Sequence, residues 1–339
     1  MQNFFQSVIN SIDEVKNNSA YFAGLLLSRG RKNCSSMAYA LSMPVKRFYQ
    51  SFNDIINKNK HTRDLLISIA NSIRAIDGIR VLVIDGTMIS KAFAKAIKSL
   101  SVDYDGVIRR VSRGLSIMVA GLVTGGNIIP LDFLFWYNKK DISHQYKTKT
   151  QLAIELIEKF YKLVSIDYVA LDGAFASSKM IESLEKFELK YSMRIPKNRK
   201  VVINGVNAPL DQQHALSLVK NERCKTAAGF YQGHACFFTI HKRKKRGGGW
   251  ERVFIISNMN LTAKEHVIAY NRRWTIDKSF RTQKQYLGLK DCQMLSDDKQ
   301  TFHILNVFLG YAYATMEKIS KRKKSVEEVI KHLWKSKKF

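Results

Sequence analysis

The sequence predicts a mixed α/β fold, in which a helical segment precedes a core of strands and helices that a run of short strands interrupts. Three observations support this prediction. Residues 1–76 carry apolar side chains at helical spacing and show no alternating strand pattern. From residue 79, β-branched runs alternate with amphipathic segments, as in a sheet whose strands are buried on both faces. Residues 200–257 contain short strand-like segments between polar and Gly-rich turns, which predicts an all-β insertion.

The N-terminal region, residues 1–76, is predicted to be a helical domain that binds DNA. Its amphipathic pieces include FFQSVINSIDEV and RDLLISIANSIRAI. Within it, SSMAYALSMPVKRFYQSF (35–52) combines a helix of small residues, a tight break and a second helix that is basic and aromatic. This pattern is typical of a helix-turn-helix, although a helical hairpin without DNA contacts has the same pattern.

The predicted core comprises residues 77–199 and 258–317, and residues 318–339 form a basic C-terminal helix and tail. The expected elements of the core are a strand at 79–85, hairpin strands at 114–123 and 128–137, a helix at 149–164, a strand ending in Asp172, a helix near 177–187 and a strand at 189–195. Thr262, with Glu265 three residues later, marks the start of a helix that is expected to continue towards Leu287.

The charge of the chain indicates a polyanionic partner. Lys and Arg number 56 against 28 Asp and Glu, which gives a net charge of +28. A field of this size attracts phosphate backbones and releases their counterions. DNA is therefore the expected partner, and a basic soluble protein or one drawn to anionic membranes is the alternative.

The remaining compositional features predict a soluble protein of the cytoplasm. The N-terminus lacks the pattern of a secretory signal, and the longest apolar run, at 304–316, is shorter than the roughly 20 residues of a spanning helix. The four cysteines lie far apart in the sequence, which indicates neither a zinc pair nor a disulfide framework.

Two aspartates stand at the ends of predicted buried strands, and each is followed by glycine, in Asp85-Gly86 and Asp172-Gly173. Functional residues gather at the carboxyl edge of such sheets. If the two strands are parallel neighbours, the carboxylates lie close together and suit a hard divalent cation. The alternative for each is a solvated aspartate that only ends a strand.

A third acid lies within the cationic stretch YNRRWTIDKSFRTQK (270–284). At about 100° per residue, one helical face less than about 90° wide presents Tyr270, Arg273, Asp277, Arg281 and Lys284. The other directions hold apolar side chains that are expected to pack the core and leave the charged face free to line a cleft: Trp274, Ile276 and Phe280. An ordinary solvated face is the alternative.

Together, Asp85, Asp172 and Asp277 would form a carboxylate triad that holds two Mg²⁺, for which Mn²⁺ can substitute. Such a site polarises a scissile phosphate and activates a water or a DNA 3′-hydroxyl for in-line displacement. The neighbouring Arg and Lys side chains would bind the phosphates.

These residues resemble the DDE transposases of bacterial insertion sequences, specifically the insertion sequence four group with its Y-(2)-R-(3)-E-(6)-K signature. Tyr270, Arg273, Asp277 and Lys284 fit that spacing, with aspartate in place of glutamate. VLVIDGTMISK and YVALDGAF are similar to the segments of the family's first and second aspartates. The resemblance extends from about residue 79 to residue 317.

The resemblance implies a ribonuclease H-like catalytic core with an all-β insertion, and cut-and-paste transposition as the activity. In this family, metal-dependent phosphodiester hydrolysis at the element ends, often through a DNA hairpin, is followed by strand transfer to target DNA. Asp85, Asp172 and Asp277 would be the metal ligands, and Tyr270, Arg273 and Lys284 would hold the terminal phosphates. The implied partners are double-stranded DNA, as terminal inverted repeats and as target, and a second copy of the chain in a homodimer on DNA.

Base flipping is also known in the family, and a flipped base needs an aromatic platform. Trp250, at the end of the basic segment HKRKKRGGGW (241–250), is a candidate for this role and for DNA binding. The alternative is that Trp250 only packs the start of the strand RVFIIS.

The aspartate at position 277 leaves the function open. Its carboxylate is roughly 1.5 Å shorter in reach than that of glutamate, whereas metal ligation tolerates a few tenths of an ångström. An active transposase is therefore one hypothesis. A catalytically impaired or domesticated DNA-binding protein and a DNA nuclease on the same fold are the alternatives.

Overall fold

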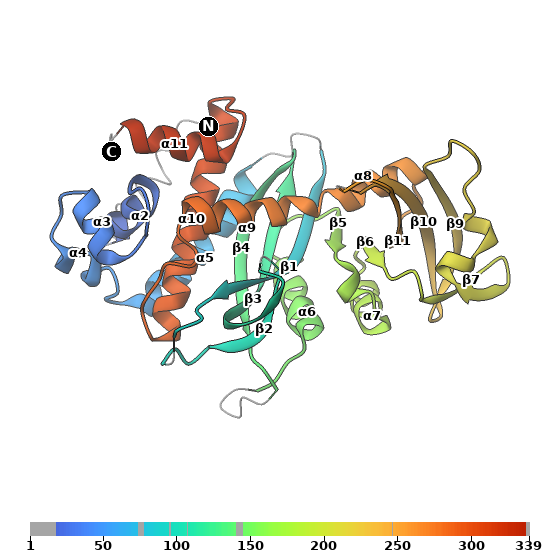
Figure 1. Cartoon of the computed structure of the whole chain (residues 1–339), viewed down its shortest axis with the longest axis horizontal. Coiled ribbons are helices and arrows are strands. Elements are labelled where there is room, and N and C mark those ends of the chain that lie inside the picture. Colours follow the sequence, from blue (N-terminus) through green and yellow to red (C-terminus); the bar gives the residue numbers. More distant parts are fainter. Residues whose placement is uncertain are drawn as a thin grey trace.

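The computed structural model describes residues 18–73, 78–94, 96–106, 108–139, 145–245 and 247–336. The predicted amphipathic helix FFQSVINSIDEV lies outside these ranges. Figure 1 shows an elongated molecule, with a helical lobe at one end, a central sheet crossed by helices and a β-rich lobe at the other end.

The N-terminal lobe is helical in its described part, as the sequence predicts. Its helices are α2 (Asn18–Leu27), α3 (Cys34–Ala40), α4 (Val45–Gln50) and α5 (Ile55–Ser72). The side chain of Asn33 caps α3 by accepting a hydrogen bond from the backbone N–H of Ser36 at 2.8 Å. The chain between α3 and α4 makes the tight break expected of a helix-turn-helix, but DNA reading by this pair stays a prediction.

A single mixed sheet runs through the molecule in the order β2-β3-β1-β5-β6-β11-β10-β9-β7-β8, with β4 beside β3. Its strands are β1 (Arg80–Ser90), β2 (Ser101–Asp105), β3 (Arg110–Thr124), β4 (Asn127–Trp136), β5 (Tyr168–Leu171), β6 (Tyr191–Ile195), β7 (Lys200–Ile203), β8 (Val206–Pro209), β9 (Cys224–Tyr231), β10 (His234–Lys244) and β11 (Trp250–Ser257). The sequence did not predict β2, whose alternating polar residues lack a β-branched run.

The centre of the sheet pairs β1 in parallel with β5, so the prediction of parallel neighbours is confirmed. Ile84 stands opposite Leu171 at the end of this pairing, which brings the next residues, Asp85 and Asp172, to one edge. The prediction that the first strand ends at Asp85 is wrong. β1 continues to Ser90, because residues 86–90 keep their antiparallel pairing with β3 after β5 has ended.

Residues 200–257 form β7–β11 with two short 3-10 turns, Leu210–Gln212 and His214–Leu216. They do not fold as a separate sheet. β11 pairs antiparallel with β6, from Phe254 opposite Ile195 to Ser257 opposite Ser192, and so extends the central sheet into the lobe seen in yellow and brown in Figure 1.

The helices that follow the strands are α6 (Lys149–Phe160), the 3-10 turn η1 (Gly173–Phe175), α7 (Ser178–Lys186), α8 (Ala263–Asn271), α9 (Trp274–Tyr286), α10 (Asp297–Ser320) and α11 (Val326–Ser336). Thr262 and Glu265 form the predicted capping box at the start of α8. The prediction of one continuous helix to Leu287 is wrong, because α8 ends at Asn271 and α9 starts at Trp274. No helix in the described part of the chain is long and apolar enough to cross a membrane.

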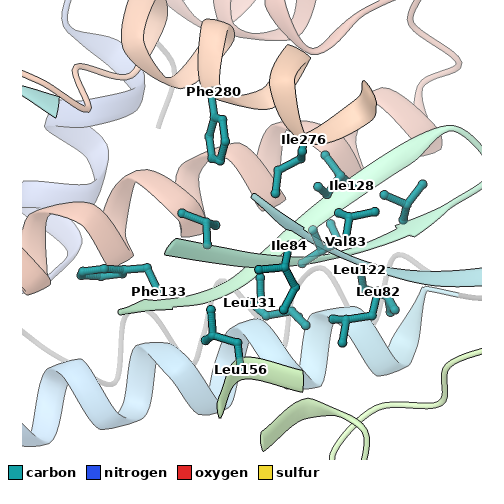
Figure 2. Close-up of a cluster of buried hydrophobic side chains, with 14 of the residues drawn as sticks. Leu82, Val83, Ile84, Leu122, Ile128, Leu131, Phe133, Leu156, Ile276 and Phe280 are labelled. Atoms are coloured by element: carbon teal, nitrogen blue, oxygen red, sulfur yellow. The ribbon is translucent and has the colours of Figure 1, made fainter. Parts of the chain in front are cut away.

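Apolar side chains fix α9 over one face of the sheet (Figure 2). Ile276 and Phe280 are 1% and 6% exposed and point from α9 towards the strands, while Leu156 of α6 packs from the opposite face. Full burial of such a side chain stabilises the fold by roughly 1.5–3 kcal/mol. This packing confirms the predicted core role of Ile276 and Phe280 and sets where the acid between them, Asp277, lies.

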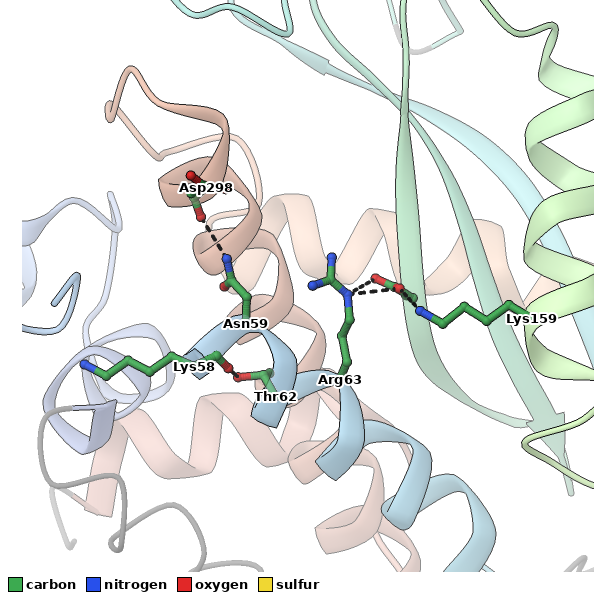
Figure 3. Close-up of polar contacts among 7 residues, drawn as sticks. Lys58, Asn59, Thr62, Arg63, Lys159 and Asp298 are labelled. Carbon is green, nitrogen blue, oxygen red and sulfur yellow. Dashed lines mark hydrogen bonds and ion pairs between the residues drawn. The ribbon is translucent and has the colours of Figure 1, made fainter. Parts of the chain in front are cut away.

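A buried acid of β4 joins two helices to the sheet (Figure 3). Asp132 accepts hydrogen bonds from Arg63 of α5 at 2.9 and 3.0 Å and from Lys159 of α6 at 2.7 Å. One turn earlier on α5, Asn59 donates to the backbone carbonyl of Asp298 in α10 at 3.2 Å. These contacts hold α5 of the N-terminal lobe against β4 and α10.

A buried histidine joins the N-terminal lobe to the core. His303 of α10 accepts a hydrogen bond from the Tyr21 hydroxyl at Nδ1 and donates from Nε2 to the Gly288 carbonyl, both at 2.8 Å. Burial and, to a smaller extent, the nearby Lys91 cation lower the pKa of His303 to about 4. The neutral ring is therefore the form that the fold holds.

We expect the free energy of unfolding to fall as the pH is lowered from about 6.5 to about 4. In this range His303 is protonated in the unfolded chain but stays neutral in the folded protein. The contribution of this residue is roughly 3 kcal/mol, fully present above pH 6.5. Urea unfolding of wild type and His303→Gln across this range measures it as the difference between the two curves. His214→Gln, at an exposed histidine, is the control, and equal slopes for all three proteins would contradict the prediction.

Candidate active site

Two carboxylates meet at the edge of the sheet where β5 ends. Asp85 lies within β1 and its side chain is 19% exposed, with Oδ1 accepting a hydrogen bond from the backbone N–H of Gly86 at 2.8 Å. Asp172 directly follows β5 and precedes η1. The parallel pairing of their strands therefore delivers both acids to one place, as the sequence predicts.

Arg273 lies between the sheet and α9 and is ion-paired with two of the three predicted acids. Its Nη1 donates to Asp85 Oδ2 at 2.6 Å, and its Nη2 lies 3.3 Å from Asp277 Oδ2. The guanidinium side chain is 6% exposed. A buried cation of this kind compensates carboxylates that would otherwise repel one another across the site.

Tyr270 connects Asp172 to the same group of side chains. Its hydroxyl donates to Asp172 Oδ1 at 3.4 Å, and its ring centroid lies 5.9 Å from the guanidinium carbon of Arg273. The ring centroid of Trp274, the first residue of α9, lies 5.1 Å from the same guanidinium carbon. Asp85, Asp172 and Asp277 are thus all held through one Tyr–Arg pair.

The electrostatics of the site reflect burial and crowding of negative charge. Burial raises the pKa of Asp85 to about 7, against the lowering effect of the Arg273 guanidinium, and the nearby Asp277 and Asp172 carboxylates add to the rise. Burial also raises the pKa of Asp277, again opposed by Arg273. Burial would lower the pKa of Arg273, but the acids around it, Asp85 first, hold it above its ordinary value.

The expected solvent-facing row of side chains is not one open face. Tyr270 and Arg273 are only 3% and 5% exposed, and the break between α8 and α9 separates Tyr270 from the rest. Trp274, predicted to pack the core, is 41% exposed. Arg272 and Arg273 keep right-handed helical backbone angles. The N–H groups of Arg273, Thr275 and Ile276, however, donate to carbonyls three residues earlier instead of four, and this tighter winding shifts the faces of α9 relative to those of α8.

The two remaining cations of the row lie farther along α9. Lys284 is close to Asp105 of β2, whose charge opposes the lowering of the Lys284 pKa by burial. Arg281 is exposed and lies near Glu327 of α11, where it contributes to the lowered pKa of that acid. Lys284 therefore lies beside β2, and Arg281 faces the C-terminal helix α11.

Trp250 lies on the β-rich lobe and does not pack into the interior, since it is 43% exposed. Three cations surround its ring at 5.7, 5.3 and 5.9 Å from the centroid: Arg223, Lys242 and Lys244. A hollow of about 670 Å³ beside it is also lined by Arg252 and Lys220. This exposed indole among cations suits contact with nucleic acid.

Three further residues link the β-rich lobe to the acids, and the sequence did not single them out individually. Arg243 is ion-paired with Glu251 and lies 5.9 Å from the Trp274 ring. Arg194, near the end of β6, acts electrostatically on both Glu251 and Tyr270. Only the basic composition of the 241–250 segment signalled this region.

The donor set fits a divalent metal ion by its chemistry. Carboxylate oxygens are the ligands that Mg²⁺ and Mn²⁺ prefer, and among the described residues Asp277 Oδ2 is buried without a hydrogen-bond donor of regular geometry. In the described part of the chain no three acidic, His or Cys side chains stand as a ready cluster of ligands. Release of the guanidinium of Arg273 from Asp85 and Asp277 would free the oxygens for an ion.

Two family models match this chain. A model described as DDE superfamily endonuclease matches residues 5–217, and one described as Transposase DDE domain matches residues 138–313. The chain belongs to the DDE superfamily of endonucleases and transposases. The first match contains Asp85 and Asp172 and the second contains Asp172 and Asp277, so the DDE matches together span the whole acidic cluster.

Other comparisons add little to this assignment of the DDE superfamily. No curated protein matches the chain. The crystal structure of Kluyveromyces polysporus Argonaute with a guide RNA is similar over 79% of this chain at 8% identity and a TM-score of 0.24. The chain spans 33% of that Argonaute chain, and a likeness at this level carries no argument about function.

We expect Arg273→Ala to lower the free energy of unfolding by about 3–5 kcal/mol at pH 8 without metal, because it leaves buried carboxylates uncompensated. Asp85→Asn in that background should restore part of the loss. Urea unfolding of the four proteins of this double-mutant cycle measures the coupling. The exposed pair Lys197 and Asp211, 3.8 Å apart, is the control, with a coupling below about 1 kcal/mol. Equal couplings for both pairs would refute the buried ion pair.

Proposed function

We propose that this DDE superfamily protein is a transposase that cuts DNA at the ends of an insertion sequence and joins them to target DNA. The observation that carries the proposal is that three acids, from β1, the end of β5 and α9, each contact the same Tyr270–Arg273 pair. The strand order β4-β3-β1-β5-β6, antiparallel as far as β1 and parallel from β1 to β6, supports a ribonuclease H-like core with β7–β11 as its insertion.

Asp85, Asp172 and Asp277 are the residues that would hold Mg²⁺ or Mn²⁺, as two ions. The chemistry that bound metal supplies is polarisation of the scissile phosphate and activation of the attacking oxygen. The spacing of tyrosine, arginine, acid and lysine from 270 to 284 supports the insertion sequence four group within the superfamily.

The cations around the triad would bind the substrate. Arg273 would release a carboxylate and bind a DNA phosphate in its place, because the guanidinium can donate two parallel hydrogen bonds to a phosphate. The Tyr270 hydroxyl would donate a hydrogen bond to a neighbouring phosphate oxygen. Lys284, farther along α9, holds the next phosphates of the strand. These contacts orient the phosphodiester and concentrate positive charge where negative charge develops during displacement.

The N-terminal lobe would recognise the element ends. Helix α4 buries only Phe48, and its other side chains, among them Lys46, Arg47, Tyr49 and Gln50, are exposed. A short, basic second helix of this kind fits the major groove as the reading element of a helix-turn-helix. Cut-and-paste transposition further requires two ends to be paired, which a homodimer on DNA provides.

The alternative is a catalytically impaired protein that binds DNA without cutting it. The observation that favours it is the short side chain of Asp277, 39% exposed and 3.3 Å from the Arg273 guanidinium. A nuclease on the same fold is a second alternative, distinguished by cutting without end specificity and without strand joining.

We expect purified protein with Mg²⁺ or Mn²⁺ to nick duplex DNA that carries the terminal inverted repeats flanking its own gene. Asp277→Asn should abolish nicking by removing a charged ligand, whereas Asp277→Glu should retain or raise it by extending the carboxylate by one methylene. Nicking is read on denaturing gels with end-labelled strands.

The matched control for Asp277→Asn is Asp64→Asn, an exposed acid on α5. Tight binding of element ends by wild type, with no cleavage in either metal and none by Asp277→Glu, would refute the enzymatic reading and favour the DNA-binding alternative. Cutting of unrelated duplexes at the same rate would favour the nuclease.

Trp250 is proposed as the platform for a flipped base at the element end. We expect Trp250→Ala to weaken end binding by about 1–3 kcal/mol, since stacking of one base on an aromatic ring contributes that much. Trp250→Phe should retain part of the affinity. A 2-aminopurine placed near the cut reports stacking by its quenched fluorescence. The control is Phe230→Ala, also exposed on the β-rich lobe. Unchanged quenching in Trp250→Ala would contradict the role.

A further inference from the structure

A two-stranded arm extends from the sheet beyond the ends of its neighbours. β1 and β4 stop pairing with β3 at Gly114 and Ser116, respectively. Past that point, β3 pairs with β2 alone, from Ser101 opposite Gly114 to Asp105 opposite Arg110. We call the described residues 101–106 and 108–114 the β2–β3 arm.

The exposed face of the arm combines large apolar side chains with arginines. Val102, Tyr104 and Val111 are 49%, 58% and 65% exposed. Tyr104 stands opposite Val111, and Val102 stands opposite Arg113, so these four side chains share one face of the arm. Arg109 and Arg110, by the turn, are also exposed.

The acids of the arm, Asp103 and Asp105, lie on its other face, away from Tyr104 and Val111. Asp103 is ion-paired with Lys149 at 2.7 Å and accepts a hydrogen bond from Ser116 at 2.7 Å. Asp105 is 5% exposed and lies near Lys284. In the described part of the arm, the exposed charged side chains are therefore all arginines.

The arm also lies along the carboxylate edge. Asp85 stands opposite Val119 on β3, and Arg110 is at the other end of that strand. The separation along the strand is at most about 30 Å at 3.3 Å per residue. This length corresponds to roughly nine phosphates along one DNA strand at 3.4 Å each. Lys284 of α9 lies near Asp105, the residue of β2 that stands opposite Arg110.

We propose that the β2–β3 arm is a DNA-binding wing that grips the duplex within about one helical turn of the cut. Its arginines bind phosphates, and Tyr104 and Val111 pack against the sugar-phosphate backbone. This proposal rests on the proposed function, in which DNA occupies the triad. A second copy of the chain fits the arm less well, because both surfaces would be positive in a chain of net charge +28.

The test is the salt dependence of DNA binding by the full chain in EDTA, which separates binding from cleavage. We expect the triple variant Arg109→Gln, Arg110→Gln, Arg113→Gln to reduce the slope of log Kd against log salt by about 2.7, or 0.9 for each lost phosphate contact. Between about 50 and 200 mM salt, wild type would then lose roughly 40-fold more affinity than the variant. Fluorescence anisotropy with a labelled element-end duplex measures both.

The control is the triple variant Lys162→Gln, Lys186→Gln, Lys190→Gln, which makes the same change in charge at exposed lysines next to the opposite ends of β5 and β6. Its slope should stay that of wild type. Tyr104→Ala should weaken binding at every salt concentration and leave the slope unchanged, since it removes no charge. Equal slopes for the two triple variants would overturn the proposal.

Two further measurements distinguish DNA binding by the arm from a role as a protein interface, and the arm proposal from the catalytic proposal. Sedimentation velocity without DNA compares the oligomeric state of the wild type with that of the triple arginine variant. A dimeric wild type and a monomeric variant would overturn the proposal, because the arm would then be a protein–protein interface. If the wild-type protein does not nick DNA but the triple arginine variant still shows the smaller salt slope, the catalytic proposal fails and the arm proposal stands.

Discussion

Compensation of the acids at the sheet edge by Arg273 is the interaction on which the site depends. Carboxylates from β1, β5 and α9 repel one another in a buried setting, and burial alone raises the pKa values of Asp85 and Asp277. The guanidinium pairs with both of these acids. It thereby allows α9 to lie close to β1 without protonation of every acid, and it provides a cation that phosphate can recruit.

The rest of the architecture positions this pair. Ile276 and Phe280 fix α9 over the sheet. Asp277 between them lies close enough to Asp172, at the end of β5, for the charge of Asp172 to raise the pKa of Asp277. Asp132 anchors α5 and α6 from the other strands, and His303 ties the N-terminal lobe to the same core. The proposed DNA contacts therefore come from elements with fixed mutual positions, which is what an in-line displacement on a long polymer requires.

Positive charge is distributed around the acids in separate places. The Trp250 hollow lies on the β-rich lobe, the β2–β3 arm extends from the opposite side of the sheet, and α4 belongs to the helical lobe. Arg243 and Glu251 connect the first of these to Trp274 beside the triad. A duplex engaged at the acids would meet cations on both sides, in keeping with the net charge of +28.

The sequence by itself determined the strands that lead to Asp85 and Asp172, the helical start of the chain, the capped start of α8 and the helical spacing that places Arg273 beside Asp277. These follow from local patterns and from the geometry of parallel strands. Only the tertiary structure decided that β1 runs on past Asp85, that β2 joins β3 in an arm and that Trp274 is exposed while Arg273 is buried. The extension of β1 needs its partner strand β3, the arm needs the pairing of β2 with β3, and the burial of Arg273 depends on its ion pair with Asp85, 188 residues earlier in the chain. Hydrophobic periodicity describes one segment at a time and does not predict which segments pair.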